Sequence, residues 1–216
     1  MSHDDARARM VAQQLAARGV RDRRVLDAMA AVRRDRFVPE TRRESAYDDR
    51  ALPLEEGQTI SQPFMVARTC ELARIGPDAR VLDIGTGSGY QAAILAELAA
   101  EVVTIERIES LAQRAERVLG ELGYGDRVTV VVGDGSLGWP ARAPYHAIVA
   151  AAGAPRIPEA LKAQLAVGGR LVLPVGSRGY QLLTVVERRG EALFDEAAFE
   201  PCVYVPLVGA EGWGGG

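Results

Sequence analysis

The feature that most constrains the fold of this chain is a glycine-rich turn at residues 85–89, which follows a short apolar segment and precedes a helical pattern. Residues 81–84 have the length of a short buried strand, and the apolar residues of segment 92–98 fit a helix. Glycine lets the backbone pass close to a ligand because it has no Cβ atom. A turn of this kind at the carboxyl end of a first strand is a cofactor-binding position in doubly wound α/β folds. The sequence therefore predicts a cofactor site at this turn.

The sequence after residue 80 alternates between short apolar segments and amphipathic segments. The predicted strands are residues 81–84, 102–105, 128–132, 147–151 and 170–175, and the predicted helices are residues 92–98, 110–122 and 158–165. Gly168 and Gly169 are expected to form the turn into the last of these strands. Two β-rich segments follow, 181–187 and 202–208, with a turn at 189–191 between them. We therefore expect an α/β fold with a doubly wound, mostly parallel sheet of about seven strands and an antiparallel element at its edge.

The first part of the chain has helical patterns instead. Apolar residues recur at helical spacing in segments 10–15 and 25–32, with Gly19 between them as a stop signal. Residues 40–57 are expected to be irregular, and a further amphipathic helix begins near residue 61. We expect residues 1–79 to form N-terminal helices and a substrate segment packed on the core. Residues 80–213 are expected to form that cofactor-binding core as a single compact unit, and residues 214–216 a disordered tail.

The spacing of the glycines distinguishes between two kinds of nucleotide cofactor. A dinucleotide-binding turn has the pattern G-x-G-x-x-G, which leaves room for a pyrophosphate at the helix N-terminus. Here the pattern is G-x-G-x-G, formed by Gly85, Gly87 and Gly89, and Tyr90 occupies the position of the last dinucleotide glycine. The carboxylate of Asp83 would repel a pyrophosphate but attract the ammonium group of a methionine moiety. The turn therefore favours S-adenosylmethionine over a dinucleotide.

Two further acidic residues lie at the ends of the second and third predicted strands. Glu106 lies about 20 residues beyond the glycine turn, where an acidic side chain can accept hydrogen bonds from both ribose hydroxyls. Asp134, which precedes Gly135, is placed to accept a bond from the adenine amino group. Each carboxylate alone would also fit a strand-end cap or a turn residue. Together with Asp83, they fit a cationic cofactor that carries a ribose and an adenine.

Composition and charge restrict the partners of the chain and its compartment. The formal net charge of −3 gives no overall positive field that would attract nucleic acid. Cys70 and Cys202 have neither the spacing of a zinc site nor the density of a disulfide framework, and no metal is expected. No apolar run approaches the roughly 20 residues that span a bilayer, and the polar, acidic N-terminus is unlike a signal peptide. We expect a cytoplasmic protein with no nucleic-acid or membrane partner, and a monomer because no coiled-coil pattern is present.

The segment before the glycine turn is the second distinctive feature. It reads Thr59-Ile60-Ser61-Gln62-Pro63 and opens the helix predicted after residue 61. Its simplest interpretation is structural, with Ser61 as the N-cap and Pro63 in the first helical turn. Spacing alone favours this structural role over a functional role for the Ser61 hydroxyl.

Both segments resemble the protein-L-isoaspartate O-methyltransferase family. The specific motif is Gly57-Gln58-Thr59-Ile60-Ser61-Gln62-Pro63, which other class I methyltransferases lack, followed by the glycine turn within residues 81–93. The resemblance covers nearly the whole chain and also includes residues 10–15, 36–39, 133–135, 154–161, 168–176 and 204–207. It implies the Rossmann-like fold of class I S-adenosylmethionine-dependent methyltransferases.

The resemblance also implies an activity. The chain is expected to transfer a methyl group from S-adenosylmethionine to the free α-carboxylate of L-isoaspartyl residues in damaged proteins and peptides, leaving S-adenosyl-L-homocysteine. The ester then cyclises to a succinimide, and hydrolysis returns some normal aspartate, so that the reaction initiates repair. One alternative is a class I methyltransferase that acts on another carboxylate or a small molecule. Another is a cofactor-binding module without catalysis, which would have little reason to keep both Ser61 and the glycine turn.

The family assigns roles to individual positions of the sequence. Ser61 takes the catalytic position, where we expect its hydroxyl to bind the substrate carboxylate and aim one oxygen at the methyl group. The expected cofactor-binding residues are Thr59, Ile60, Asp83, Gly85, Thr86, Gly87, Gly89, Glu106, Asp134 and Gly135.

Two positions depart from the family pattern. His146 stands where the family usually has Asp in the fourth strand, at a position expected to face the cofactor side. This replacement puts a supporting polar contact in doubt, although His146 would also fit a partly exposed strand residue. Gly153 is inserted among the alanines of segment 150–154. Neither change touches Ser61 or the glycine turn.

Overall fold

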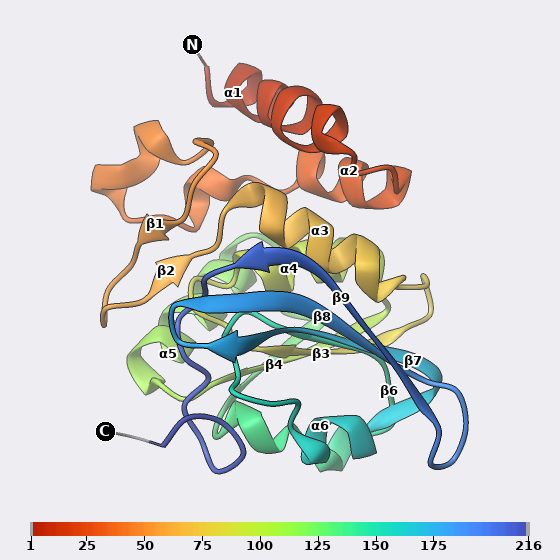
Figure 1. Ribbon diagram of the computed structural model, residues 1–216. Helices are drawn as coiled ribbons and strands as arrows, with labels where there is room; N and C mark the ends of the chain where they lie inside the picture. The colour runs from red at the N-terminus through yellow and green to blue at the C-terminus, as the bar shows by residue number, and fades with distance from the viewer. Residues whose placement is uncertain (1, 215–216) are drawn as a thin grey trace.

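A seven-stranded sheet forms the centre of the protein (Figure 1). The computed structural model describes residues 2–214 of the chain. Across the sheet the strands run in the order β5 (Val128–Val132), β4 (Glu101–Glu106), β3 (Arg80–Ile84), β6 (Tyr145–Ala150), β7 (Leu165–Ser177), β8 (Tyr180–Arg188) and β9 (Phe194–Cys202). The first five strands pair in parallel, and β8 and β9 add to the edge in antiparallel orientation. The predicted fold class is therefore confirmed, including the antiparallel edge.

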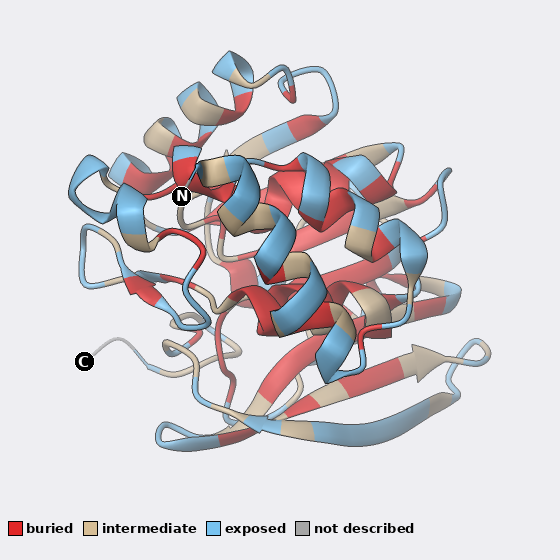
Figure 2. Cartoon of the chain, turned by 90° about the horizontal axis from the view of Figure 1, so that it is seen from above, coloured by how far each residue is buried: buried red, intermediate tan, exposed pale blue. Residues whose placement is uncertain are grey.

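Helices cover both faces of the sheet, as expected for a parallel sheet buried on both sides. Helices α2 (Arg23–Ala31), α3 (Pro63–Ala73) and α4 (Tyr90–Leu98) lie over one face, and α6 (Glu159–Ala163) lies on the other (Figure 1). Successive β3 side chains enter different hydrophobic clusters, Val81 under α3 and α4 and Leu82 on the α6 side. Figure 2 shows the resulting layers, with buried strands beneath helices whose outer turns are exposed.

The N-terminal region follows the predicted pattern with local changes of helix type. Helix α1 (His3–Arg9) continues as the π-helix η1 (Met10–Leu15) and the 3₁₀ turn η2 (Ala16–Arg18), and this run ends at Gly19 with a φ of 101°. Buried side chains of this region, among them Met10, join the same hydrophobic cluster as Val81 of β3. The proposed division between residues 79 and 80 remains a prediction.

The region expected to be irregular contains short elements. The 3₁₀ turns η3 (Arg34–Arg36) and η4 (Glu40–Ser45) come first, and β1 (Leu52–Pro53) then pairs antiparallel with β2 (Thr59–Ile60). Residues 52–60 therefore form a small hairpin directly before α3. Its tip is tied to α5 (Glu109–Glu121) by Glu55, which pairs with Arg114, and by Glu56, which accepts a bond from Ser110.

One strand prediction near the end of the chain was wrong in position. The last strand occupies Phe194–Cys202 instead of residues 202–208. Most of β9 is exposed, so its sequence lacks the apolar alternation that marks a half-buried strand. Residues 203–213 form a connection held by isolated bridges, such as Gly153 to Pro206. The apolar residues of this connection were mistaken for a strand because they line a cavity, described below.

Strand β7 begins before the predicted turn at Gly168 and Gly169. It starts at Leu165, and the predicted helix 158–165 is correspondingly shorter. The pairing of β6 with β7 shifts register between Tyr145 and Ala147, so the two glycines lie in an irregular part of the strand. A Cβ on Gly169 would lie 2.9 Å from the carbonyl oxygen of Tyr145. The glycine pair therefore permits close backbone approach within the sheet instead of a turn before it.

No helix within residues 2–214 is long and apolar enough to cross a membrane. Of the tail predicted to be disordered, residues 215–216 lie outside the described residues.

The central position of β3 generates a stability prediction. Leu82 is fully buried, and truncation to alanine removes its contacts and leaves a cavity between β3 and the α6 side of the sheet. We expect Leu82→Ala to lower the free energy of unfolding by about 2–5 kcal/mol, measured by urea denaturation. Val167→Ala is the control, because Val167 is 66% exposed and should change stability by no more than about 0.5 kcal/mol. Equal effects of the two changes would contradict this description of the core.

Candidate active site

The glycine turn joins β3 to α4 at the carboxyl edge of the sheet. Gly85, Gly87 and Gly89 all have positive φ values, of 90°, 52° and 88°, which other L-residues rarely adopt. The amides of Gly85 and Thr86 donate to the Ile105 carbonyl at 2.9 and 3.2 Å, which ties the turn to β4. Gly89 is the N-cap of α4, and a Cβ there would lie 3.3 Å from Leu119. Gly89 therefore allows the turn to form and leaves room for the side chain of Leu119 in α5. It does not line the cavity described next.

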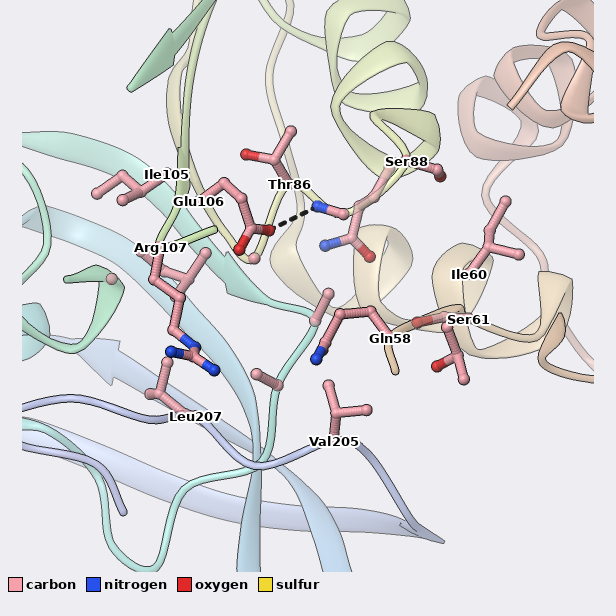
Figure 3. A pocket seen from close by; sticks show the side chains of 18 of the residues that line it. Gln58, Ile60, Ser61, Thr86, Ser88, Ile105, Glu106, Arg107, Val205 and Leu207 are labelled. Carbon is pink, nitrogen blue, oxygen red and sulfur yellow. Dashed lines mark hydrogen bonds between the residues drawn. The ribbon is translucent and has the colours of Figure 1, made fainter. Parts of the chain in front are cut away.

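An open cavity of about 750 Å³ lies against this turn (Figure 3). It is bounded by the β1–β2 hairpin, the ends of β3, β4 and β6, and the connection after β9. The predicted residues that line it are Thr59, Ile60, Ser61, Gly85, Thr86, Gly87, Glu106 and Gly135. The structure thus brings together predicted residues that lie up to 76 positions apart in the chain, from Thr59 to Gly135, and the cavity wall also includes residues 205–208. The predicted residues Asp83, Gly89 and Asp134 do not line this cavity.

Glu106 is the acidic side chain on the cavity wall. It is only 7% exposed, and one of its oxygens accepts a hydrogen bond from the backbone amide of Gly87 at 2.9 Å (Figure 3). The other oxygen accepts from the backbone amide of Ile108 at 3.0 Å. These bonds fix the carboxylate while each oxygen keeps further accepting capacity. A fixed carboxylate of this kind suits a ligand with neighbouring hydroxyl groups.

Asp83 is buried beneath the turn. Its oxygens accept bonds from Gln91 Nε2 and Thr104 Oγ1, each at 2.8 Å. Burial, with a smaller contribution from Glu106, raises the pKa of Asp83 to about 6, although the two hydrogen bonds oppose the rise. Gln91 and Thr86, which is 2.7 Å from Thr104 between hydroxyl oxygens, do line the cavity. Asp83 therefore does not reach the cavity to contact a ligand ammonium group. It holds Gln91 directly and Thr86 through Thr104, and these two residues face the cavity.

Asp134 holds the C-terminal connection. Its Oδ1 accepts bonds from the amide and hydroxyl of Ser136 at 2.9 and 2.7 Å, and its Oδ2 accepts from the Ala210 amide at 2.7 Å. Although burial opposes it, these bonds hold the pKa of Asp134 below its ordinary value. A Cβ on Gly209 would clash with Oδ1 of the same carboxylate. The structure thus uses Asp134 to fix residues 209–211, whereas Gly135 lies on the cavity wall.

Ser61 lies between this cavity and a second one. The second cavity, of about 510 Å³, is lined by Ala51, Thr59, Ser61, Gln62, Met65, Pro201, Cys202, Val203 and Tyr204. Ser61 and Thr59 are common to both cavities. Burial raises the pKa of the Tyr204 phenol above its ordinary range, so this group stays protonated at neutral pH.

The helix-cap interpretation of Ser61 was wrong. Helix α3 begins at Pro63 with Gln62 as its N-cap, and no side chain caps it. The residue before a proline is restricted to extended backbone, and Gln62 has the corresponding φ of −52° and ψ of 137°. The Ser61 hydroxyl is therefore not engaged at the helix end.

The two departures from the family pattern lie in different places. His146 is exposed near the amino-terminal end of β6, where its Nδ1 accepts a bond from the Arg80 amide at 3.0 Å. The cavity lies at the opposite, carboxyl end of the strands, so the expectation of a cofactor-facing position was wrong. Gly153 pairs with the C-terminal connection through bonds of 2.8 Å to Val205 and Leu207. A Cβ there would lie 2.9 Å from Gln181, which explains the glycine.

Several cavity residues were missed by the sequence analysis. They are Gln58, Ser88, Arg107, Ala151, Ala152 and the segment 205–208. Arg107 could have been identified from its position directly after Glu106. The segment 205–208 had no such signal, because its apolar residues were read as a strand. No group of three or more His, Cys, Asp or Glu side chains that could hold a metal ion is found in residues 2–214.

Comparison with known proteins identifies close relatives of the chain. Residues 6–212 match the family model described as protein-L-isoaspartate(D-aspartate) O-methyltransferase. Protein-L-isoaspartate O-methyltransferase 1 of Rhodopseudomonas palustris (strain HaA2) is 53% identical over 211 residues, which span 96% of this chain and 84% of the relative.

Solved structures share the fold. One protein-L-isoaspartate O-methyltransferase superposes with a TM-score of 0.84 at 27% identity, covering 95% of this chain and 67% of that chain. A beta-aspartate methyltransferase from Plasmodium falciparum, solved in complex with S-adenosyl-L-homocysteine, superposes with a TM-score of 0.81. This second structure is 22% identical to the chain, covering 96% of this chain and 99% of that chain, and its similarity shows the fold alone.

The raised pKa of Asp83 predicts a pH-dependent stability. Its ordinary pKa is 3.8, so the folded state binds this proton more tightly than the unfolded state. The protonated carboxyl of Asp83 therefore stabilises the folded state fully below about pH 4, and this contribution is lost as the pH rises through about 6. We expect the free energy of unfolding of Asp83→Asn, relative to wild type, to increase by up to about 3 kcal/mol between pH 4 and pH 7. Urea denaturation of the ligand-free proteins at both pH values measures this difference.

Asp134→Asn is the matched control. The pKa of Asp134 is lowered, so its stabilising effect is present at neutral pH and lost on acidification. The stability of Asp134→Asn relative to wild type should therefore change little between pH 4 and pH 7 and increase only when the pH falls below about 4. A pH-independent difference for Asp83→Asn would show that Asp83 does not titrate as described.

Proposed function

The chain belongs to the protein-L-isoaspartate(D-aspartate) O-methyltransferase family, and from this we propose that it methylates the free α-carboxylate of L-isoaspartyl residues in damaged proteins and peptides. The methyl donor is S-adenosylmethionine, and the products are S-adenosyl-L-homocysteine and a methyl ester. The ester cyclises to a succinimide without further catalysis, and hydrolysis returns part of it to normal aspartate. The observation that carries the proposal is that Ser61 lies on the wall shared by two cavities.

The first cavity has the chemistry that the cofactor requires. Glu106 offers accepting capacity at a fixed position for the two ribose hydroxyls, and the side chains of Ile105 and Leu207 offer apolar surface for the adenine. The positive φ of Gly85 and Gly87 lets the backbone pass the methionine end without a Cβ. The bound cofactor supplies a methyl group on a positively charged sulfur. We assign the cofactor contacts to Thr59, Ile60, Gly85, Thr86, Gly87, Glu106 and Gly135, with Asp83, Gly89 and Asp134 supporting them.

The second cavity suits the peptide substrate. Its lining combines apolar residues such as Ala51, Met65 and Val203 with polar groups, and Val203 is 69% exposed and thus accessible to a bound chain. A peptide held there can present one carboxylate at the Ser61 wall.

Ser61 positions the substrate in this arrangement. An isoaspartyl carboxylate has a pKa near 4 and is already ionised at neutral pH, so no strong general base is needed. The Ser61 hydroxyl donates a hydrogen bond to one carboxylate oxygen and directs the other toward the first cavity. The rate enhancement then comes from proximity and alignment.

The proposal includes the oligomeric state, the cellular location and the partners of the enzyme. A monomeric cytoplasmic protein without nucleic-acid or membrane partners agrees with the formal net charge of −3 and with two free cysteines, as expected in a reducing compartment. The division into a substrate-facing part, residues 1–79, and a cofactor-binding core, residues 80–213, agrees with the placement of Ser61 and Glu106 on the two sides.

A peptide assay tests the proposed function. The purified protein is incubated with labelled S-adenosylmethionine and either an isoaspartyl peptide or the same peptide with normal aspartate. We expect methyl transfer to the isoaspartyl peptide alone, because only its free α-carboxylate matches the substrate. Cofactor binding without transfer to either peptide would favour a methyltransferase acting on another carboxylate or small molecule.

Replacing Ser61 tests its catalytic role. We expect Ser61→Ala to lower kcat by about 10- to 100-fold, because the carboxylate loses the hydrogen bond that aligns it. Calorimetry should give a dissociation constant for S-adenosyl-L-homocysteine within about twofold of wild type, because the hydroxyl is not needed to bind the cofactor. A kcat within about twofold of wild type would remove Ser61 from the catalytic role.

Glu106→Ala is the companion variant and should give the opposite pattern. Loss of its carboxylate removes the acceptor for the ribose hydroxyls, so we expect cofactor affinity to fall by about tenfold or more. Unchanged binding in the same calorimetric measurement would exclude Glu106 from the cofactor site.

A further inference from the structure

The active-site serine lies in a two-residue joint. Upstream, Ile60 pairs with Leu52 in the β1–β2 hairpin, and downstream α3 begins at Pro63. Ser61 and Gln62 connect these two elements and belong to neither. The position of the Ser61 hydroxyl between the cavities therefore depends on what fixes this joint.

A single residue far from the joint in sequence holds Gln62. The Gln62 side-chain amide donates to Asp49 twice, to Oδ1 at 2.7 Å and to the backbone carbonyl at 3.2 Å. Because both partners on Asp49 are acceptors, only one orientation of the amide satisfies them. Asp49 thus fixes both the orientation and the position of the Gln62 side chain, which is adjacent in sequence to Ser61.

Asp49 is itself held by the N-terminal helices. Its Oδ2 accepts a bond from Arg18 Nη1 at 2.7 Å. The Arg18 guanidinium lies 3.8 Å from the centre of the Phe64 ring, in the first turn of α3. Gln62, Asp49, Arg18 and Phe64 therefore form a continuous series of contacts beside the joint, which we call the Asp49 clamp.

We propose that Asp49 is a positioning residue for methyl transfer, which acts through Gln62 to set the place of the Ser61 hydroxyl. Asp49 lines neither cavity, so it does not touch the cofactor or the peptide. The inference rests on the proposed function and gives the N-terminal region a role in the reaction. The precision of alignment at Ser61 is set by residues on the outer surface of the molecule.

The exposure of the clamp separates this role from a role in folding. The side chains of Arg18 and Asp49 are 41% and 37% exposed, and ion pairs at such exposure contribute little to global stability. A small displacement of a group that aligns a reacting atom nevertheless has a large effect on rate. Loss of the clamp should therefore change kcat much more than it changes the melting temperature.

Four variants of the whole chain test the proposal in the isoaspartyl peptide assay. Asp49→Ala removes the carboxylate, and Asp49→Asn keeps one oxygen that can accept from Gln62. Gln62→Ala removes the donor, and the double variant combines Asp49→Ala with Gln62→Ala. Asp48→Ala is the matched control, because the neighbouring carboxylate bonds only Arg50 among the described residues.

We expect Asp49→Ala to lower kcat about tenfold, with the dissociation constant for S-adenosyl-L-homocysteine and the melting temperature nearly unchanged. Asp49→Asn should recover most of the loss, and Asp48→Ala should match wild type. The double variant should be no slower than the slower single variant, because both changes break the same contact.

Two results would overturn the proposal. One is a kcat of Asp49→Ala equal to that of Asp48→Ala. The other is additive losses in the double variant. If wild-type protein methylates neither peptide, the proposed function fails instead, and the wild-type measurement distinguishes that failure from a failure of the clamp.

Discussion

The parallel alignment of β3 with β4 and β6 is the constraint on which the site depends. Ile84 pairs with Ile105 on one side and with Ala150 on the other, so three strands end at the same level. The chain continues from these ends as the glycine turn, as Glu106 and as the Ala151 segment, and backbone bonds of 2.8 to 2.9 Å hold the turn against both neighbours. One edge of one sheet thus collects the polar and backbone groups of a cofactor cavity from three separate parts of the sequence.

Much of this arrangement could be predicted from the sequence because it follows from local periodicity. Short apolar segments separated by helices require a parallel sheet, and the order of the strands then places Glu106 beside the glycine turn. The buried position of Asp83 could also have been predicted from the sequence. Side chains alternate along a strand, and Asp83 shares the face of Val81, under α3 and α4, instead of pointing out of the strand end. Of the three predicted acidic residues, the one closest in sequence to the turn is therefore the one buried beneath it.

The remaining parts of the site depend on contacts between distant segments, for which a single sequence has no signal. Asp134 resembled a ligand-binding acid, and only the return of the chain at Ala210 shows that both of its oxygens are occupied. The segment 205–208 was read as a strand because its residues are apolar. Apolar residues also line a cavity wall, so composition alone does not distinguish the two. The role of Ser61 was ambiguous for a similar reason. Its neighbour Pro63 fits a helix start, and the structure moves the cap to Gln62 and leaves the hydroxyl at the boundary of two cavities.

Strand β9 has a consequence for the behaviour of the molecule in solution. As the last strand of the sheet, it leaves one row of backbone groups without a neighbouring strand among the residues described, and such an edge can recruit a strand from another molecule. Its sequence counters this. Asp195 pairs with Arg189 and Glu200 with Arg68, so among the described residues Glu196 is the acidic side chain of this strand that has no ion pair. Pro201 removes an amide donor near the end of the strand. A second copy that approached edge to edge would meet charged side chains and an interrupted hydrogen-bond ladder. The strand that escaped recognition because it lacks apolar alternation thus carries features that disfavour pairing through its edge.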